Sequence, residues 1–300
     1  MSKLVHFNVF FASLVLVFLA STAQADENLW GYIRGAETLP QGSWDLYQVL
    51  TSRTDKGIGT YSALDSKTEV EYGMTNSLSV SGALLMQSVF AHNILIDAYV
   101  PADINKGMSP SGVEFSAKYN FLSPAKDDIG LSTYLSINHK WLDMHSGQDK
   151  DSTSMELEFM LQKYFLEGEL IWAGNFGTES TYAKRYGVAN LPNNFDWPTY
   201  PEMEIAWNAG TAISYRFVPK WFVGAEIIYE TEYETEVGQE RWSTFVGPNL
   251  HYASEKWWAT VTWFLQPQGG GPGYSGQTDD TVHLIEKTKQ EARLKVGWNF

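Results

Sequence analysis

Apolar and polar residues alternate along much of this chain with a period of two residues. In residues 153–165, for example, Met155, Leu157 and Phe159 fall on one side of an extended chain and Glu156 falls on the other. The side chains of a β-strand point alternately to its two faces, whereas a helix returns to one face every three or four residues. The pattern therefore predicts strands with one apolar and one polar face, and an all-β protein.

Twelve stretches of about 10–14 residues carry this pattern, and each has roughly the length needed to cross a bilayer at a tilt. An even number of strands allows the first and last to pair antiparallel and close a transmembrane β-barrel. The predicted strands are residues 43–53, 64–73, 78–88, 111–121, 129–141, 153–165, 168–178, 202–217, 221–233, 242–253, 256–267 and 289–300.

The connections between these strands alternate in length. The short ones are residues 74–77, 122–128, 166–167, 218–220 and 254–255, and the longer ones are 54–63, 89–110, 142–152, 179–201, 234–241 and 268–288. Short periplasmic turns and longer outer loops are typical of outer-membrane barrels, and a soluble β-sandwich would not readily reproduce this asymmetry. Both termini of the barrel are then expected in the periplasm.

Residues 1–25 have the organisation of a secretory signal peptide. Lys3 gives a positive start, residues 7–20 form an apolar run, and Ala23 and Ala25 supply the small residues of a cleavage site after Ala25. The apolar run is shorter than the roughly 20 residues that a membrane-spanning helix needs. Export is therefore expected.

Two further parts follow the signal peptide. Residues 26–42 are expected to form a periplasmic lead-in, which Pro40 and Gly42 interrupt before the first strand. Residues 43–300 are expected to form the outer-membrane barrel.

The composition narrows the possible partners and chemistry. The formal net charge is −14, and nucleic-acid binding needs clustered Lys and Arg, so no nucleic-acid partner is expected. The absence of cysteine excludes thiolate metal ligands and a cysteine nucleophile, and no metal or cofactor is expected. The 16 Phe, 12 Trp and 16 Tyr concentrate near the predicted strand ends, where they would form belts at the membrane interfaces.

If the apolar faces contact lipid, the charged side chains must face the barrel interior. An excess of carboxylates in an open lumen would favour cations or neutral solutes, whereas the same glutamates could instead pair with Lys and Arg as filling. The predicted lumen-lining residues are Glu69, Glu71, Glu114, Lys118, Lys140, Glu156, Glu158, Glu169, Glu202, Glu204, Arg216, Glu226, Glu230, Arg293 and Lys295.

The sequence contains none of the common catalytic motifs. His92 and His283 lie in loops without a nucleophile motif beside them, and no G-x-S-x-G, H-E-x-x-H or P-loop pattern occurs, so an enzyme is not expected.

In residues 89–101, apolar side chains at near-helical spacing allow either a short helix folded into the barrel mouth or a packed loop cap. The Gly- and Pro-rich residues 268–276 are expected to form a flexible surface loop rather than a calcium site.

The last strand carries a more specific signal. Residues 289–300 end on Trp298, Asn299 and Phe300, and they resemble the closing strand of bacterial outer-membrane barrels. That resemblance implies that Trp298 and Phe300 form a signal for the barrel-assembly machinery and that the protein resides in the lipid of the outer membrane of a Gram-negative bacterium.

A second resemblance covers about a third of the chain. Residues 36–82, with Leu39-Pro40-Gln41-Gly42 before the first strand and Glu69-Val70-Glu71-Tyr72-Gly73-Met74-Thr75 at the end of the second, resemble the proposed transporters of phenol meta-pathway degradation operons, as do residues 118–135. The resemblance implies a small barrel with a porin-like role and carries over no functional residues.

These observations predict an outer-membrane porin-like channel or transporter for small solutes. Two alternatives stay open: a non-conducting structural or adhesive barrel whose long loops meet partners outside the cell, and a barrel enzyme.

Overall fold

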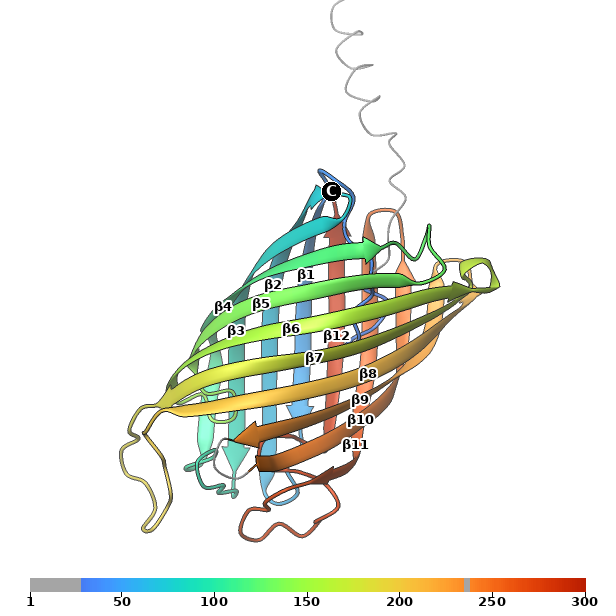
Figure 1. The fold of residues 1–300 in the computed structure, drawn as a ribbon. Coiled ribbons are helices and arrows are strands. Elements are labelled where there is room, and N and C mark those ends of the chain that lie inside the picture. Colours follow the sequence, from blue (N-terminus) through green and yellow to red (C-terminus); the bar gives the residue numbers. More distant parts are fainter. Residues whose placement is uncertain (1–27, 235–237) are drawn as a thin grey trace, which may run out of the picture.

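The computed structural model describes residues 28–234 and 238–300, so the predicted cleavage-site residues Ala23 and Ala25 lie outside the described part. Twelve antiparallel strands form a single closed barrel in which each pairs with its sequence neighbours and the first pairs with the last (Figure 1). They are β1 (Trp44–Thr54), β2 (Thr60–Thr75), β3 (Leu78–His92), β4 (Ile104–Leu122), β5 (Gly130–Leu142), β6 (Asp149–Phe165), β7 (Leu170–Arg185), β8 (Glu202–Val218), β9 (Trp221–Glu234), β10 (Gly238–Ala253), β11 (Trp257–Gly270) and β12 (Gln290–Asn299). A 3₁₀ turn, η2 (Leu166–Gly168), joins β6 to β7.

The predicted all-β class, the antiparallel arrangement and the twelve strands are confirmed. Most strands are longer than predicted at the end that carries the long loops: β2 begins at Thr60, β4 begins at Ile104 and β7 runs on to Arg185. Polar residues interrupt the alternation there, but the backbone ladder continues past them because neighbouring strands still supply hydrogen-bond partners. We call this the loop end of the barrel, and the opposite one, where the carboxyl terminus lies, the turn end (Figure 1).

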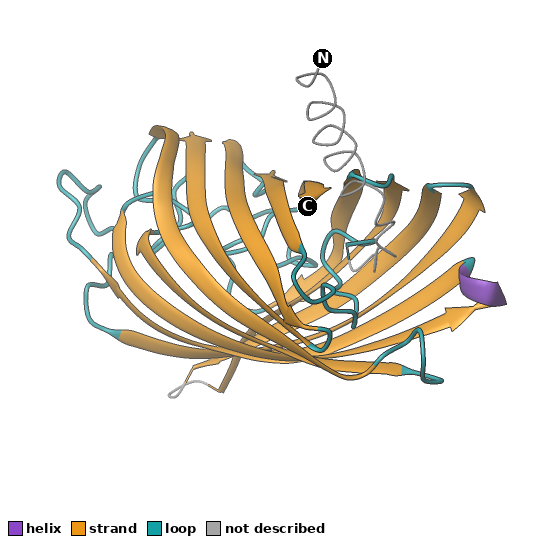
Figure 2. Ribbon diagram, turned by 90° about the horizontal axis from the view of Figure 1, so that it is seen from above, coloured by secondary structure: helices purple, strands orange, loops and turns teal. Residues whose placement is uncertain are grey.

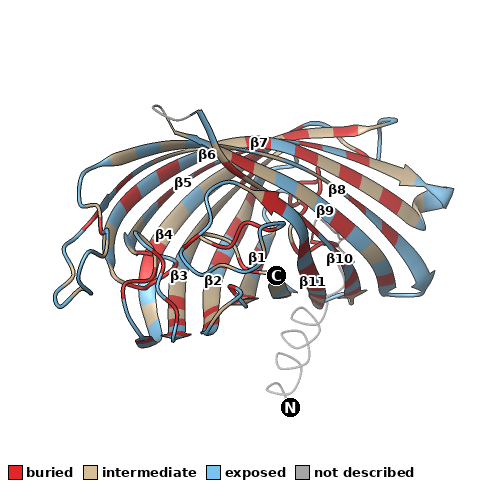
Figure 3. Ribbon diagram, turned by 90° about the horizontal axis from the view of Figure 1, so that it is seen from below, coloured by how far each residue is buried: buried red, intermediate tan, exposed pale blue. Residues whose placement is uncertain are grey.

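The two faces of the strands differ as the alternation requires. Large apolar side chains such as Phe115, Ile137 and Met155 lie exposed on the outside, with 51–63% of their surface accessible. The polar residues between them are mostly buried or half-buried inside, which produces the banded strands of Figure 3. Among the described residues, no helix has the length and apolar character needed to cross a membrane.

Pairing of β1 with β12 closes the barrel. Thr51 lies opposite Arg293 and Val49 lies opposite Lys295. Asp45 is buried, and its partner in the register is Asn299. The main chains of Trp44 and Phe300 exchange two hydrogen bonds at the turn end. The side chains of Trp298 and Phe300 lie exposed there.

An apolar cluster caps part of the loop end. It joins Ile94, Ile96 and Val100 from the 93–103 loop to Tyr274 and Leu284 from the 271–289 loop, all nearly inaccessible to solvent. Of the two alternatives for this region, the structure shows the packed loop cap and not the short helix. Residues 89–92 extend β3, and the rest forms a loop held by a bridge between Ile96 and Val100. Burial of Tyr274 also anchors the segment that was expected to be a surface loop.

Lys56 ties the 55–59 loop to this cap. Its ammonium is buried and donates hydrogen bonds to the carbonyl oxygens of Leu284, Ile285 and Lys287, at 3.1, 2.6 and 2.9 Å. It also lies 4.9 Å from the centre of the Tyr61 ring. One side chain thus satisfies three backbone acceptors of the 271–289 loop.

We predict that Lys56→Met loosens the 271–289 loop while the barrel stays folded. The substitution retains the packing volume but leaves three carbonyls without their donor, and a buried polar group that loses its partner costs about 1–3 kcal/mol. Amide hydrogen exchange should accelerate in residues 281–289 and stay unchanged in the strands. Lys126→Met, at an exposed position in the 123–129 turn, is the matched control. Unchanged exchange in the loop would contradict the role of Lys56.

Candidate functional site in the barrel interior

The first described residues lie inside the barrel. We call residues 28–42 the inner segment. They were expected as a periplasmic lead-in ahead of the barrel, and their position relative to the membrane stays a prediction. Within the molecule, the strands enclose them (Figure 2). Leu29 and Trp30 are fully buried, and they pack with Ile33 against Ile171 and Phe222 on the strands. The segment thus fills part of the lumen with a small apolar core of its own.

One carboxylate holds the middle of the inner segment. Glu226 on β9 accepts hydrogen bonds from the backbone N–H groups of Gly31, Tyr32 and Ile33, at 2.9, 2.8 and 3.0 Å. Its oxygens also accept the Thr262 hydroxyl at 2.7 Å. A carboxylate that accepts several N–H bonds is well suited to a buried position, because the donors replace its hydration. A Cβ at Gly31 would lie 2.5 Å from the Thr262 hydroxyl oxygen, so this close approach requires glycine.

Arg34 fixes the deepest part of the inner segment. Its guanidinium pairs with Glu156 and Glu158 on β6, at 2.9 and 2.8 Å, and lies 4.1 Å from the centre of the Tyr134 ring. Its backbone N–H donates to the side chain of Asn175. Two glutamates predicted to line the lumen thus share one guanidinium, which comes from a residue that precedes the barrel.

The inner segment then returns to the turn end. The Ala36 N–H donates to the Gln162 side chain, and the Leu39 N–H donates to the Ser79 hydroxyl, at 2.7 and 2.9 Å. Gly42 finally pairs with the backbone of Gly73. The segment therefore occupies the turn end of the lumen as a loop that enters, turns near Arg34 and leaves again before β1.

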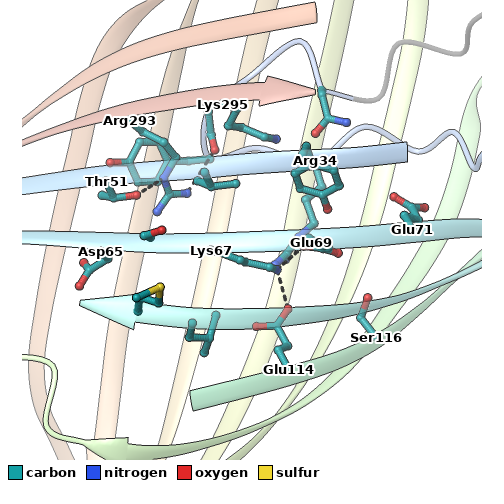
Figure 4. Close-up of a pocket in the computed structure, with 18 of the residues that line it drawn as sticks. Arg34, Thr51, Asp65, Lys67, Glu69, Glu71, Glu114, Ser116, Arg293 and Lys295 are labelled. Atoms are coloured by element: carbon teal, nitrogen blue, oxygen red, sulfur yellow. Dashed lines mark hydrogen bonds and ion pairs between the residues drawn. The ribbon is translucent and has the colours of Figure 1, made fainter. Parts of the chain in front are cut away.

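Two adjoining cavities remain inside the barrel. The segment-side cavity, about 350 Å³, is bordered by Tyr32 and Arg34 of the inner segment and by the inner faces of β1, β2, β3, β4, β5 and β12 (Figure 4). The loop-side cavity, about 320 Å³, lies between β5–β10 and the 271–289 loop. Lys140 and Met144 line both cavities, so the two volumes meet at these side chains.

Most of the residues proposed from sequence to line the lumen lie on the inner face. The two that do not are Glu169 and Arg216, which lie exposed at the turn end and face each other at 3.8 Å. Glu169 belongs to the 166–169 turn rather than to a strand, and Arg216 is close to the end of β8. The inner ones are Glu69, Glu71, Glu114, Lys118, Lys140, Glu156, Glu158, Glu202, Glu204, Glu226, Glu230, Arg293 and Lys295.

Many of these carboxylates form ion pairs with basic side chains. Glu69 and Glu114 both contact the ammonium of Lys67, each at 2.6 Å (Figure 4). Glu202 pairs with Arg185 at 2.5 Å, and Glu230 pairs with Lys287. Sequence reasoning missed Lys67, although its parity with Glu69 on the same predicted strand could have identified it.

Three glutamates of the loop-side cavity gather around one guanidinium. Carboxylate oxygens of Glu204, Glu232 and Glu286 lie within 4.8 Å of one another, a spacing that a metal ion could bridge. The guanidinium of Arg241 already contacts Glu232 and Glu286 and lies 3.9 Å from Glu204. Arg241 supplies one positive charge against these carboxylates, so the arrangement is an ion-pair network centred on its guanidinium.

The buried histidines of the loop end are uncharged at neutral pH. Burial lowers the pKa of His283 to about 4, and burial holds the pKa of His145 well below its usual range. Neither ring nitrogen of His283 has a hydrogen-bond partner in the described residues. His92 instead faces Asp103 at 2.7 Å on the exposed surface. These contacts give neither His92 nor His283 a hydroxyl nucleophile to activate.

A family profile described as "Family of unknown function (DUF6662)" matches residues 22–300, so the chain belongs to that family. No curated protein sequence matches it.

Solved barrels share the architecture. The COG4313 outer membrane channel from Pseudomonas putida F1 is similar with a TM-score of 0.55 and 10% identity, over 88% of this chain and 98% of that chain. The β domain of the Bordetella autotransporter BrkA gives a TM-score of 0.49 with 12% identity, over 87% and 100% of the chains. The KdgM porin gives 0.42 with 13% identity, over 86% and 99%. At 10% identity, the similarity to the COG4313 channel shows a shared fold and nothing further. The other two similarities have TM-scores below 0.5, and we draw no conclusion from them.

We predict that Glu226→Ala frees the inner segment. The change removes the shared acceptor of three buried N–H groups, and each unsatisfied group costs about 1–3 kcal/mol, where 1.4 kcal/mol is about tenfold in an equilibrium. Amide hydrogen exchange at Gly31, Tyr32 and Ile33 should accelerate at least about tenfold. Glu169→Ala, which removes an exposed carboxylate at the turn end, should leave those amides unchanged. Equal protection in both variants would show that Glu226 does not hold the segment.

Proposed function

We propose that this protein is a porin-like channel for small solutes in the outer membrane of a Gram-negative bacterium, and that the inner segment narrows it at the turn end. The observation that carries the proposal is the enclosed interior: a closed barrel with a polar lining surrounds two cavities that meet at Lys140 and Met144. A barrel with a completely filled interior would leave no such polar space.

The outer surface supports the location. Apolar and aromatic side chains are exposed along the strands, and in water such an extended apolar surface would favour aggregation. We further propose that Trp298 and Phe300, exposed at the end of the chain, are recognised by the barrel-assembly machinery, and that the turn end, with both ends of the barrel, faces the periplasm. The likeness to phenol-pathway transporters and the identity of the solute stay predictions.

The position of the two ends of the inner segment suggests how the channel opens. The segment enters and leaves through the turn end, and residues 37–42 are tied to that end by hydrogen bonds from Leu39 and Gly42. Residues 28–36 could therefore withdraw without disturbing the strand ladder. The lumen would then extend to the turn end.

Membrane insertion is tested by a charge on the outer surface. Ile137, half exposed in the middle of β5, should contact lipid, and an Arg at the membrane midplane costs about 2–4 kcal/mol. We expect Ile137→Arg to lower the free energy of unfolding in liposomes by about that amount. Glu255→Arg, in an exposed turn, should have little effect. An equally small effect of both substitutions would place Ile137 outside the lipid.

The channel is tested by planar-bilayer conductance. We expect a small single-channel conductance for the full mature chain and a severalfold larger one after deletion of residues 28–36, because the deletion removes Trp30, Ile33 and Arg34 from the lumen. Deletion of residues 188–195 in the 186–201 loop is the control and should leave conductance unchanged. Folding of each variant is checked by heat-modifiable gel migration. Absence of conductance in both the full chain and the 28–36 deletion would refute the channel and favour a structural or adhesive barrel.

A further inference from the structure

The segment-side cavity carries positive charge although the protein is acidic. Its lining includes four acidic side chains, Asp65, Glu69, Glu71 and Glu114, against six basic ones, Arg34, Lys67, Lys118, Lys140, Arg293 and Lys295. The formal charge of the lining is therefore +2, and it stays positive, at +1, when the ion-pair partners Arg53, Glu156 and Glu158 outside the lining are included, whereas the charge of the whole chain is −14. A cavity of the opposite sign to its protein attracts ions that the rest of the surface repels.

Three of the four acidic side chains of this cavity are engaged in ion pairs. Asp65 contacts Arg53 at 2.6 Å, and Glu69 and Glu114 each contact Lys67 at 2.6 Å. These carboxylates are consequently not available to hold a mobile cation. The expectation that a carboxylate excess makes the interior cation-preferring does not apply to this cavity.

Two of the basic side chains have no such partner. In residues 28–234 and 238–300, neither Lys140 nor Arg293 forms an ion pair with a carboxylate. Arg293 is nevertheless held in place: its guanidinium lies 3.7 Å from the centre of the Tyr32 ring and donates to the Thr51 hydroxyl at 2.9 Å and to the Gly31 carbonyl at 3.1 Å. Figure 4 shows Arg293 and Lys295 near Thr51 of the neighbouring strand β1, with Lys67 and Glu114 farther along the same wall, on β2 and β4.

A guanidinium fixed by neutral partners retains its full charge and several N–H donors for a ligand, and Arg matches a carboxylate in both geometry and charge. Lys140, at the junction of the two cavities, adds a second charge whose ammonium has no hydrogen-bond partner in the described structure. Val49, Leu85 and Met86 contribute apolar surface to the same cavity. The lining thus combines unpaired positive charge with an apolar wall.

We propose that the segment-side cavity binds a small organic anion, a carboxylate with a short apolar tail, with Arg293 and Lys140 as the residues that select its charge. The inference deepens the proposed channel function, on which it rests, by naming the class of solute. The loop-side cavity has no such preference, because its five basic and six acidic side chains leave a formal charge of −1.

The test is isothermal titration calorimetry on the full mature protein refolded in a zwitterionic detergent, with hexanoate as the probe. Hexanamide and hexylammonium have tails of similar length but carry no charge or the opposite charge. We expect hexanoate to bind at least about tenfold more tightly than either, and its affinity to fall severalfold between about 0.05 and 0.5 M KCl, since salt screens the attraction.

Lys140→Gln and Arg293→Gln should each weaken hexanoate binding at least about fivefold, with little effect on hexanamide. Lys140→Gln removes no hydrogen bond or ion pair within the described residues, and heat-modifiable gel migration checks that the variant folds. Lys126→Gln makes the same change of charge on an exposed turn and should leave binding unchanged. Hexanoate binding no tighter than hexylammonium, or unaffected by both cavity substitutions, would overturn the proposal.

Binding and conductance separate the two claims. If the protein conducts but does not prefer hexanoate, the anion site is wrong and the channel stands. If hexanoate binds as expected but neither the full chain nor the 28–36 deletion conducts, the cavity is an anion site in a barrel that is not a channel.

Discussion

Closure of the strand ladder by β1 and β12 is the constraint on which the rest of this structure depends. A barrel without free edges satisfies its own backbone hydrogen bonds, and it sends every second side chain of each strand into one enclosed interior. With Phe115 and Ile137 outside, the polar partners in their strands have no alternative to facing inward. The interior must then neutralise its own charges with whatever the chain supplies.

The chain meets that requirement in two ways. Some inner charges pair across strands, as Lys67 does with Glu69 and Glu114. Others depend on residues 28–42: Glu226 accepts three backbone N–H groups, and Glu156 and Glu158 share Arg34. The inner segment is therefore both a filling of the lumen and the counter-charge for part of its wall. This double role explains why the acidity of the whole chain does not predict the charge of the remaining space.

The cavity beside the inner segment is the consequence. Three of its four carboxylates are in ion pairs, whereas Arg293 is held by an aromatic ring, a hydroxyl and a carbonyl, none of which cancels its charge. At the loop end the balance differs, because Arg241 faces several glutamates at once. The charge of each cavity thus follows from which side chains remain unpaired, and not from how many charges the sequence contains.

The sequence by itself determined the barrel. Alternation in stretches such as 153–165 fixes which side chains face outward, because a strand has only two faces, and the short and long connections order the two ends. It also put most charged lumen residues on the correct face. Near the strand ends the alternation weakens, and it no longer predicts which side chains face inward. Glu169 and Arg216 accordingly lie exposed at the turn end instead of inside.

Only the tertiary structure decided what fills the barrel. The stretch Gly31-Tyr32-Ile33-Arg34 has no periodicity, and its conformation is set by distant partners, Glu226, Glu156 and Glu158, which are more than a hundred residues away. Residues 89–101 have helical spacing but form strand and loop, since the apolar contacts of Ile94 and Val100 with Leu284 form only once the barrel brings the two loops together. The local sequence pattern determines which face of each strand points inward. How the inward side chains then pair depends on charges that are remote in the sequence, because only the folded chain brings them within reach of one another.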